Sequence, residues 1–301
     1  MKWGRLVART TMPTVRYEAP RSVTDAVRLM QSDPDARVLA GGTDLLIQFR
    51  AGLRQPSAFI DVKLIPELVD ITVREDGVRI GASAPATAIC EHATIEQWWP
   101  GLVEAVHLIG STQIQGRASV GGNLCNGSPA ADSVCALIVN RAVCLVAGPG
   151  GERRVPVEQF CSSPGRTVLQ PGELLIALDL PRPQPGTADA YLRLIPRTEM
   201  DIAVAGAAVS VTLDNGGRCR AARVAIGAVA PTALLVPSAG EALVGSTLDD
   251  DALARAADLA RAAARPIDDK RGTAAYRRHV VGVLVKRAAA AAAARAKGQR
   301  A

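Results

Sequence analysis

The run Ser-Val-Gly-Gly-Asn-Leu-Cys-Asn-Gly-Ser-Pro-Ala-Ala-Asp-Ser, residues 119–133, is the stretch from which the fold can be inferred. Gly121, Gly122 and Gly127 have no Cβ, so the backbone can adopt positive φ there and approach a ligand closely. Successive backbone N–H groups in such a loop form a concavity that suits an anion. One carboxylate, Asp132, closes the run, and a carboxylate is a common partner of a ribose hydroxyl. The alternative interpretation is a tight glycine-rich turn between strands.

A second glycine pair comes about eighty residues earlier, in the run Val-Leu-Ala-Gly-Gly-Thr-Asp-Leu-Leu, residues 38–46. This run predicts a short strand that leads into a glycine turn, with Asp44 able to cap a helix that starts near Leu45. It is neither a phosphate-binding lysine loop nor the three-glycine dinucleotide fingerprint, because it has no third glycine and no Lys-Ser or Lys-Thr follows. Two glycine loops in one chain predict a long phosphate-bearing ligand that is held from two sides.

Together the two motifs resemble those of the FAD-binding medium subunit of molybdenum hydroxylases. This family includes carbon monoxide dehydrogenase, the bacterial N-heteroaromatic hydroxylases and the flavin domain of xanthine dehydrogenase. The resemblance extends from about Pro13 to about Arg287. It implies an α+β fold, in which a two-lobed FAD-binding domain of the PCMH type has a small β-α-β lobe and an antiparallel-sheet lobe. A C-terminal domain with a three-stranded antiparallel sheet and helices would follow.

The domain boundaries that we expect follow from the resemblance and from local composition. Pro and Gly are concentrated in residues 182–186, which predicts a linker, and Met12-Pro13 would be a natural alternative start. The poly-alanine run near the C-terminus has no amphipathic pattern, so we expect its end to fray. The expected parts are an N-terminal extension (1–12), the FAD-binding domain (13–185, with lobes at about 13–66 and 67–185), the C-terminal domain (186–288) and a basic Ala-rich tail (289–301).

Hydrophobic periodicity and turn residues predict the individual elements. Helices are expected at residues 24–31, 45–51, 87–90, 102–109, 249–264 and 273–294. Strands are expected at residues 37–40, 59–62, 69–73, 78–80, 141–147, 153–157, 172–181, 190–196, 203–213 and 218–228.

The resemblance also implies which residues bind the cofactor. The FAD pyrophosphate would be held by Leu39, Ala40, Gly41, Gly42, Thr43, Asp44 and Leu45 from the first motif and by Ser119, Val120, Gly121, Gly122 and Asn123 from the second. Asp132 would contact the ribose, and Ile109, Leu175 and Arg193 fall where relatives place residues against the isoalloxazine or the adenine. The xanthine dehydrogenase type has Phe and Lys at the positions of Ile109 and Arg193, so an aromatic stacking partner is missing here. Because neither motif contains a basic side chain, the phosphates would be met by amide N–H groups and hydroxyls.

Composition excludes several other functions. No apolar run reaches the ~18 residues of a membrane helix, and the N-terminal residues lack a signal-peptide core, so we expect a cytoplasmic protein without a membrane span. The net charge of +6 comes from the two ends of the chain: nine basic and no acidic residues lie from Lys270 onward. Since no aromatic residues are interleaved with them, nucleic-acid binding is not expected. The six cysteines contain no Cys-x-x-Cys pair, so we expect no metal or cluster in this chain.

No Ser/His/Asp triad or pair of catalytic carboxylates can be assigned, and His107 is expected to be structural. The resemblance therefore implies an electron-transfer oxidoreductase subunit. A large molybdopterin subunit would hydroxylate an N-heterocycle, aromatic compound or aldehyde, and a small subunit with two [2Fe-2S] clusters would relay electrons to FAD in this chain. The external acceptor would be NAD, a quinone, a cytochrome or oxygen, and the complex would be a dimer of heterotrimers.

Other interpretations stay open at the level of the sequence. One is a carbon monoxide dehydrogenase medium subunit, and another is a stand-alone flavin oxidoreductase of the same broad fold. A third is a non-enzymatic nucleotide-binding or regulatory module. A loop at residues 197–201 matches a family loop near the flavin, and a charged hairpin turn is the alternative for it.

Overall fold

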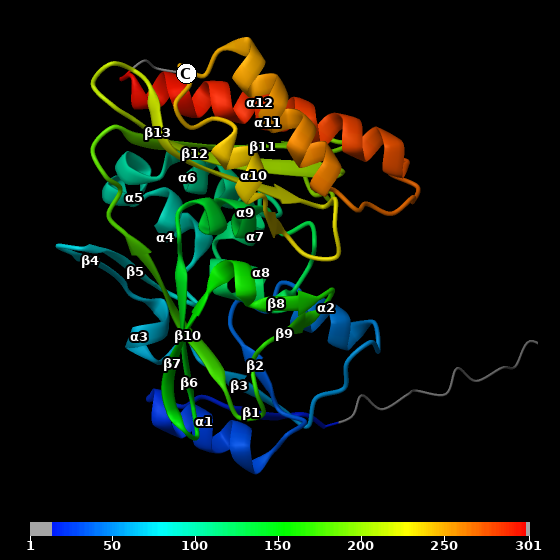
Figure 1. The fold of residues 1–301 in the computed structure, drawn as a ribbon. Coiled ribbons are helices and arrows are strands. Elements are labelled where there is room, and N and C mark those ends of the chain that lie inside the picture. The colour runs from blue at the N-terminus through cyan, green and yellow to red at the C-terminus, as the bar shows by residue number, and fades with distance from the viewer. Residues whose placement is uncertain (1–13, 299–301) are drawn as a thin grey trace, which may run out of the picture.

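The computed structural model describes residues 14–298, and the first lobe is a three-stranded parallel sheet with two helices (Figure 1). The expected extension at 1–12 lies outside the described residues. The sheet order is β1-β3-β2, and the predicted β-α-β unit is confirmed. Its elements are β1 (Arg16–Glu18), α1 (Val23–Ser32), β2 (Arg37–Leu39), α2 (Leu45–Arg50) and β3 (Ala58–Asp61).

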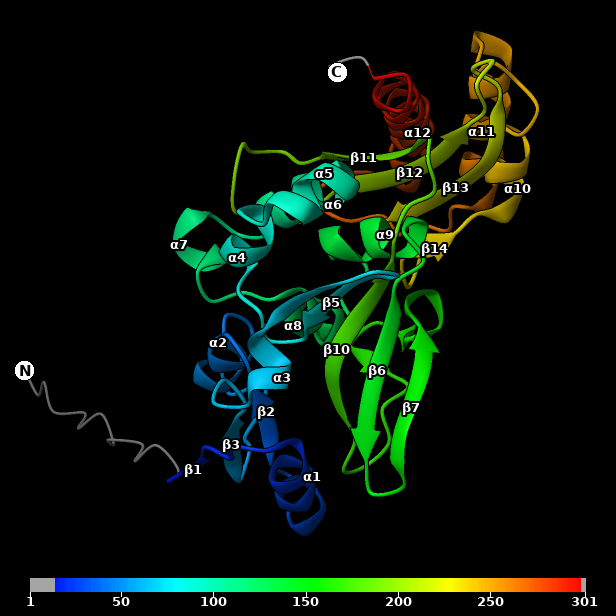
Figure 2. The same ribbon diagram turned by 90° about the vertical axis from the view of Figure 1, so that its left-hand side faces the viewer.

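The second lobe is built on a five-stranded antiparallel sheet of order β4-β5-β10-β6-β7 (Figure 2). The strands are β4 (Ile71–Arg74), β5 (Gly77–Gly81), β6 (Val143–Gly148), β7 (Gly151–Pro156) and β10 (Leu174–Pro181). Short helices connect or cover them: α3 (Pro66–Val69), α4 (Ala86–Cys90), α5 (Ala93–Trp98), α6 (Pro100–His107), α7 (Thr112–Gln115), α8 (Val120–Asn126), α9 (Asp132–Val139) and the 3-10 turn η1 (Val157–Gln159). A two-stranded hairpin, β8 (Cys161–Ser163) and β9 (Arg166–Thr167), also belongs to this lobe.

The 119–133 motif is largely helical, and the prediction of a continuous loop there was wrong. Ser119 is the N-cap of α8, and its Oγ accepts a hydrogen bond from the Gly122 N–H at 3.1 Å. Gly127 ends the helix in the left-handed conformation, at φ 65°. A serine N-cap and a glycine C-cap are sufficient boundaries for a short helix, although the glycine pair inside the motif favoured a loop.

The C-terminal domain has a four-stranded antiparallel sheet of order β11-β12-β13-β14. The three predicted strands are present as β11 (Thr187–Leu194), β12 (Ala205–Leu213) and β13 (Cys219–Gly227), and the structure adds the short edge strand β14 (Leu234–Leu235). One face of the sheet is covered by α11 (Asp250–Ala263) and α12 (Ala274–Ala296), with α10 (Pro237–Glu241) beside β13. The other face packs on α6 and α9 of the second lobe, which fixes the two domains against each other.

The poly-alanine run is an ordered part of α12, so the expectation that it frays was wrong. Ala288, Ala289, Ala292 and Ala293 are buried in the C-terminal core, within a helix that continues to Ala296. Their spacing places these small side chains on one face of the helix, and small side chains allow a helix to approach a sheet closely. An all-alanine run shows no amphipathic contrast, because the buried and the exposed faces have the same side chain. The expected boundary between 288 and 289 therefore falls inside a helix.

A buried polar cluster joins the second lobe to the C-terminal domain. Asp189 of β11 is 1% exposed, and its carboxylate accepts hydrogen bonds from the Gly101 N–H at 2.9 Å and from Asn140 Nδ2 at 2.6 Å. Arg295 of α12 donates to the Asp189 carbonyl at 2.8 Å and forms an ion pair with Glu104 of α6. Burial raises the pKa of the Asp189 carboxyl to about 6, against the opposing effect of its two hydrogen bonds.

We expect this carboxyl to make the protein less stable as pH rises from about 4 to about 6. A carboxyl whose pKa is higher in the folded than in the unfolded state binds an additional proton in this range, and the stability that the proton supplies is lost when it dissociates. The shift corresponds to roughly 3 kcal/mol. When the free energy of urea unfolding is plotted against pH, Asp189→Asn should reduce the slope in this range, whereas the exposed control Asp35→Asn should leave it unchanged. Equal slopes for wild type and Asp189→Asn would contradict the assignment.

Candidate functional site

A cavity of about 950 Å³ lies between the two lobes of the N-terminal domain. Its walls come from the turn after β2, the start of α2, the first turns of α8, the β8–β9 hairpin and the beginning of β10. The 38–46 and 119–133 motifs, about eighty residues apart in the chain, therefore face the same space. This volume is within the usual range for pockets that hold cofactors and other small molecules.

Most of the predicted binding residues line this cavity. Those that line it are Ala40, Gly41, Gly42, Thr43, Asp44, Leu45, Ile109, Ser119, Gly121, Gly122, Asn123 and Leu175. Leu39 and Val120 are buried, and Asp132 and Arg193 form an ion pair; none of these four is part of the lining. The structure thus brings twelve of the sixteen residues together, and their contacts with FAD stay a prediction.

The glycines of the motifs do more than provide space for a ligand. A Cβ at Gly41 would overlap the backbone carbonyl of Arg117, and a Cβ at Gly121 would overlap the backbone of Ala82. These two glycines let separate chain segments lie against each other at the edge of the cavity. Gly42 instead has a positive φ of 76°, which a residue with a side chain rarely adopts.

Asp44 does not cap α2 with its side chain, contrary to the sequence-based prediction. It has helical backbone angles, and its side chain makes no capping hydrogen bond. Its carboxyl lines the cavity instead, and burial raises the pKa of this carboxyl above its ordinary value. Asp44 occupies the N-cap position but lacks the extended backbone angles from which an N-cap side chain accepts a hydrogen bond from the N–H groups of the first turn.

Three arginines line the cavity, which the two motifs alone did not reveal. Arg37 comes from β2, Arg54 follows α2, and Arg166 belongs to β9. The acidic Glu173 also lines the cavity, but it forms an ion pair with Arg153 at 2.7 Å. The expectation that phosphates would be met without basic side chains stays a prediction: the glycine motifs lack such side chains, but neighbouring elements bring three of them to the cavity. Of the three arginines, Arg37 is the one that directly precedes a glycine motif in the sequence, so its position near the cavity could have been inferred from the sequence.

Asp132 and Arg193 form a buried pair that joins α9 to β11. Their side chains are 8% and 5% exposed, and Asp132 Oδ2 accepts a hydrogen bond from Arg193 Nη1 at 2.5 Å. The Tyr191 hydroxyl donates to Asp132 Oδ1 at 2.6 Å. Both carboxylate oxygens therefore have protein partners, while Arg193 Nε is buried without a hydrogen-bond acceptor among the described residues. The ribose contact of Asp132 stays a prediction.

Several other residues from the sequence analysis lie away from the cavity. His107 is exposed at the end of α6, and its carbonyl accepts a hydrogen bond from Gln115 Nε2 at 2.6 Å. Within the 197–201 loop, Arg197 and Asp201 form an ion pair at 3.1 Å, as a charged turn would. This loop does not line the cavity.

The described cysteines are distributed between the cavity and the hydrophobic core. Cys125 lines the cavity, whereas burial raises the pKa of the Cys135 and Cys144 thiols. Over residues 14–298, no group of three or more His, Cys, Asp or Glu side chains is arranged to hold a metal ion. No helix in this part of the chain has the length and apolar character needed to cross a bilayer.

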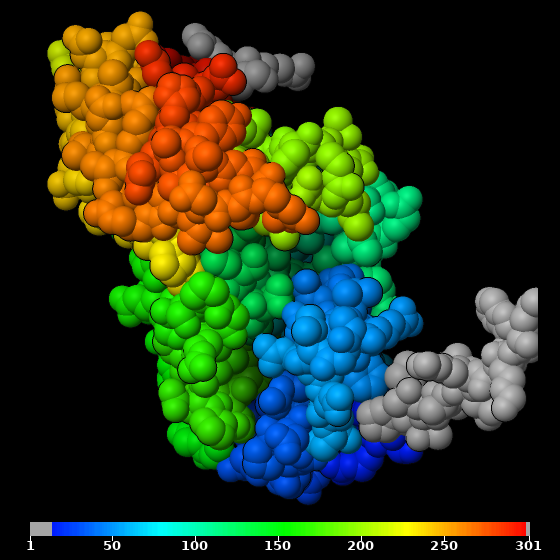
Figure 3. Space-filling view, turned by 90° about the vertical axis from the view of Figure 1, so that its right-hand side faces the viewer, coloured from blue at the N-terminus to red at the C-terminus, as the bar shows by residue number. Residues whose placement is uncertain are grey.

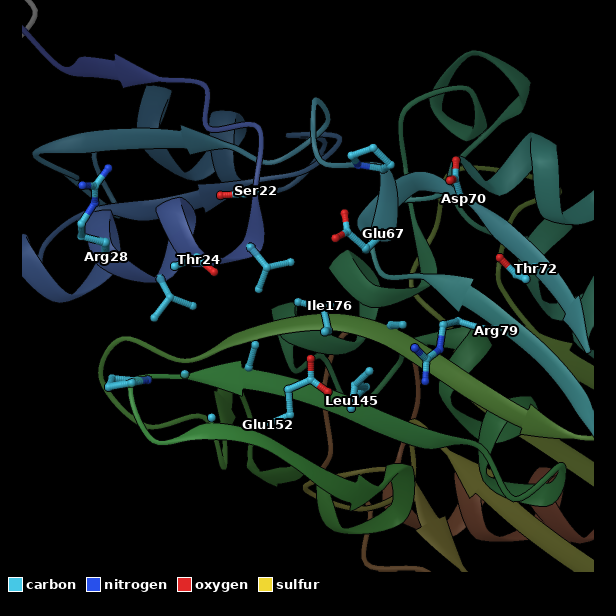
Figure 4. A pocket seen from close by; sticks show the side chains of 18 of the residues that line it. Ser22, Thr24, Arg28, Glu67, Asp70, Thr72, Arg79, Leu145, Glu152 and Ile176 are labelled. Carbon is cyan, nitrogen blue, oxygen red and sulfur yellow. The ribbon is translucent and has the colours of Figure 1, made fainter.

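A second groove, of about 800 Å³, lies between α1 and the outer face of the second lobe's sheet (Figure 4). Its charged side chains balance, since Arg28, Arg74 and Arg79 face the groove together with Glu67, Asp70 and Glu152. No residue of either glycine motif lies there. The two spaces have similar volumes, so it is the glycine motifs and not the size that identify the inter-lobe cavity as the candidate site.

The residues around the inter-lobe cavity fit FAD. The glycine turns bring the backbone to the wall of the cavity, and the three arginines supply positive charge for a pyrophosphate. A two-lobed domain with such a cavity, followed by a sheet-and-helix domain, defines a flavoprotein of the medium-subunit class.

Comparison with known proteins identifies the family. Residues 13–183 match the model of the FAD binding domain in molybdopterin dehydrogenase, and residues 190–292 match that of the CO dehydrogenase flavoprotein C-terminal domain. The carbon monoxide dehydrogenase medium chain of Afipia carboxidovorans is 37% identical, over 93% of this chain and 97% of that protein. The xanthine dehydrogenase FAD-binding subunit of Escherichia coli O157:H7 is 31% identical, over 94% of this chain and 97% of that protein.

Solved structures agree with this assignment. The carbon monoxide dehydrogenase of Hydrogenophaga pseudoflava that lacks the Mo-pyranopterin moiety has a chain with a TM-score of 0.91 and 36% identity, covering 95% of this chain and 99% of that one. Quinoline 2-oxidoreductase from Pseudomonas putida 86 gives a TM-score of 0.88 at 28% identity, with coverage of 95% and 99%. The chain belongs to the family of FAD-binding medium subunits of molybdenum hydroxylases, an oxidoreductase family. The predicted family, fold class and FAD cofactor are thereby confirmed.

Gly41→Ala is expected to destabilise the protein by at least about 2 kcal/mol, because the new methyl group meets a backbone carbonyl that cannot move aside cheaply. The matched control is Gly116→Ala, whose methyl group would have no atom within 4 Å and whose backbone is helical. Urea unfolding of both variants measures the difference. Equal stabilities would show that the lobes are not in contact at Gly41.

Asp132→Asn tests whether this carboxylate is committed to Arg193. The change leaves the buried guanidinium without an anionic partner, and we expect a loss of roughly 3–5 kcal/mol of unfolding free energy. Asp214→Asn, in an exposed turn, is the control. Unchanged stability of Asp132→Asn would mean that the carboxylate is not held by Arg193 in solution and is free for a ribose hydroxyl.

Proposed function

We propose that this chain holds FAD in the inter-lobe cavity and transfers electrons within a heteromeric molybdenum hydroxylase. In this proposal, [2Fe-2S] clusters of a small partner subunit supply the electrons, and a large molybdopterin subunit hydroxylates the substrate. The observation that carries the proposal is the meeting of the 38–46 and 119–133 motifs on one cavity in a chain of this family.

The residues of this chain bind and orient the cofactor. FAD supplies reversible electron transfer when it is bound, while the protein supplies position and electrostatics. Backbone groups of the glycine turns and the side chains of Thr43 and Asn123 would contact the phosphates and sugars. Arg37, Arg54 and Arg166 would offset the charge of the pyrophosphate. Arg193 is held by Asp132, and its Nε–H, which has no acceptor among the described residues, would be left to donate to a carbonyl group beside it.

The finer features of the complex are also proposals. We propose an N-heterocycle, an aromatic compound or an aldehyde as substrate, with carbon monoxide as the alternative that the relatives named carbon monoxide dehydrogenase medium chain favour. The acceptor would be NAD, a quinone, a cytochrome or oxygen. The assembly would be a dimer of heterotrimers, because oligomers usually close with two-fold symmetry. The cytoplasmic location stays a prediction.

Flavin content tests the cofactor part of the proposal. The purified full-length chain or its complex should carry one FAD per chain, and acid precipitation should release all of it, because the sixteen predicted binding residues include no His or Cys to which a flavin could be attached. Flavin absorbance of the supernatant and of the redissolved pellet measures this. Flavin that remains in the pellet would contradict non-covalent binding.

Native mass spectrometry of the endogenous protein tests the subunit part. We expect a complex with a large and a small subunit, and hydroxylase activity only in that complex. The isolated chain should show at most diaphorase activity with NADH or a dye. Hydroxylase activity in a fraction that contains only the monomer would refute the proposal, and the partners in a complex would indicate the substrate.

A further inference from the structure

Helix α2 forms one wall of the cavity, yet it is weakly anchored in its own lobe. None of its six residues is buried, and Ile47 is 59% exposed. Leu53, which follows the helix, is 77% exposed. Within its lobe, the Phe49 ring of α2 packs edge-on against the Phe59 ring of β3, with centroids 5.4 Å apart. Because burial of apolar side chains is the main source of a helix's stability in a protein, this limited burial gives polar contacts a larger part in holding α2.

One such contact is a hydrogen bond from α2 to the second lobe. Gln48 Nε2 donates to Asn126 Oδ1 at 3.0 Å, across 78 positions of the chain. Both residues line the cavity. Gln48 comes from the first lobe and Asn126 is the last residue of α8 in the second, so the bond spans the two walls. Figure 3 shows this side of the molecule, where the light-blue segment that contains α2 lies against the green second lobe.

The two partners are themselves fixed by neighbouring groups. Arg54 Nε donates to Gln48 Oε1 at 2.8 Å, which leaves the amide nitrogen of Gln48 directed at Asn126. Beside Asn126, the Gly127 carbonyl accepts a hydrogen bond from the Gly165 N–H at 2.9 Å, in the β8–β9 hairpin that also lines the cavity. The bond therefore connects α2 with the part of the cavity wall that is formed by α8 and the β8–β9 hairpin.

We propose that Gln48 and Asn126 act as a clasp that keeps α2 closed over bound FAD and sets the rate at which the cofactor leaves. The inference rests on the proposed FAD site and assigns two positioning residues that neither glycine motif indicated as a pair. A polar clasp suits this role, because a single side-chain hydrogen bond is weak enough to open on its own and still slows release severalfold.

Two isosteric substitutions, separately and together, test the clasp. In Asn126→Asp the carboxylate still accepts from Gln48 Nε2. In Gln48→Glu the Asn126 amide can rotate and donate to the new carboxylate. The double variant places two carboxylates against each other, and these repel at pH 8. Each single variant should change the FAD release rate by less than about threefold, whereas the double variant should release FAD roughly tenfold faster than the product of the single effects.

FAD release is followed by the recovery of flavin fluorescence after dilution of the loaded full-length protein, and association is measured by its quenching. The association rate should stay within about threefold of wild type, because the isosteric substitutions leave the shape of the cavity unchanged. The matched control is a double variant that combines Asn126→Asp with Gln113→Glu, which lies on the exposed face of another short helix. In this control, the change in the FAD release rate should equal the product of the changes in the two single variants.

Multiplicative effects in the Gln48→Glu/Asn126→Asp variant would overturn the clasp, since they would mean that each residue acts on FAD by itself. A fall in the association rate together with a lower melting temperature would also overturn it, because it would indicate a general structural role. Failure of the wild-type protein to bind FAD would refute the proposed function instead, so the two failures are distinguishable.

Discussion

The contact between Gly41 and the backbone carbonyl of Arg117 is the constraint on which the rest of the site depends. It lies where the two lobes meet, and no side chain fits between the two backbones. Because Gly41 belongs to the 38–46 motif and Arg117 comes just before the 119–133 motif, this contact places both motifs on the same cavity. A larger residue would separate the lobes and so widen the space between the two walls that the ligand has to bridge.

The two lobes are also held together by apolar packing at α1. There, α1 packs Ala26 and Val27 against Leu145 and Ile176 of the second lobe's sheet. The apolar packing at α1 and the polar bond between Gln48 and Asn126 have different consequences for the way the lobes are held together. Apolar burial holds the lobes in a fixed orientation, whereas the exposed helix α2 can separate from α8 at a lower free-energy cost. The structure thus combines a rigid frame with a wall that can open for cofactor exchange.

Three arginines (Arg37, Arg54 and Arg166) and two acidic residues (Asp44 and Glu173) line the cavity, so its lining has more basic than acidic side chains. Glu173 is paired with Arg153, and Asp132 is paired with Arg193. Asp44 lines the cavity, but burial raises the pKa of its carboxyl and so makes the charged form less favourable. An anionic dinucleotide in the cavity would therefore face more basic than unpaired acidic side chains. The basic C-terminal segment has a separate use, since Arg295 joins the C-terminal domain to α6.

Much of the fold could be predicted from local patterns, and the exceptions have physical reasons. Helix α1, the strands β11, β12 and β13 and helix α11 follow from hydrophobic periodicity and turn residues. Helix α8 was missed because two glycines lower its intrinsic propensity, while Ser119, Gly127 and the packing of Val120 and Leu124 outweigh that effect. The end of α12 was misjudged because periodicity cannot show which face of an alanine run is buried.

The sequence by itself determined the family and the two glycine motifs, and most of the binding residues predicted from it line the cavity, because short motifs require particular residues at fixed spacing. Tertiary structure alone decided which of these residues reach the cavity and which are used in packing. Asp132, which was predicted to contact a ribose, is paired with Arg193, a residue 61 positions away, and its ribose contact stays a prediction. Arg54, Arg166 and the bond between Gln48 and Asn126 also depend on tertiary structure. Such contacts join residues far apart in the chain, and only the folded arrangement of the two lobes brings them within hydrogen-bonding distance.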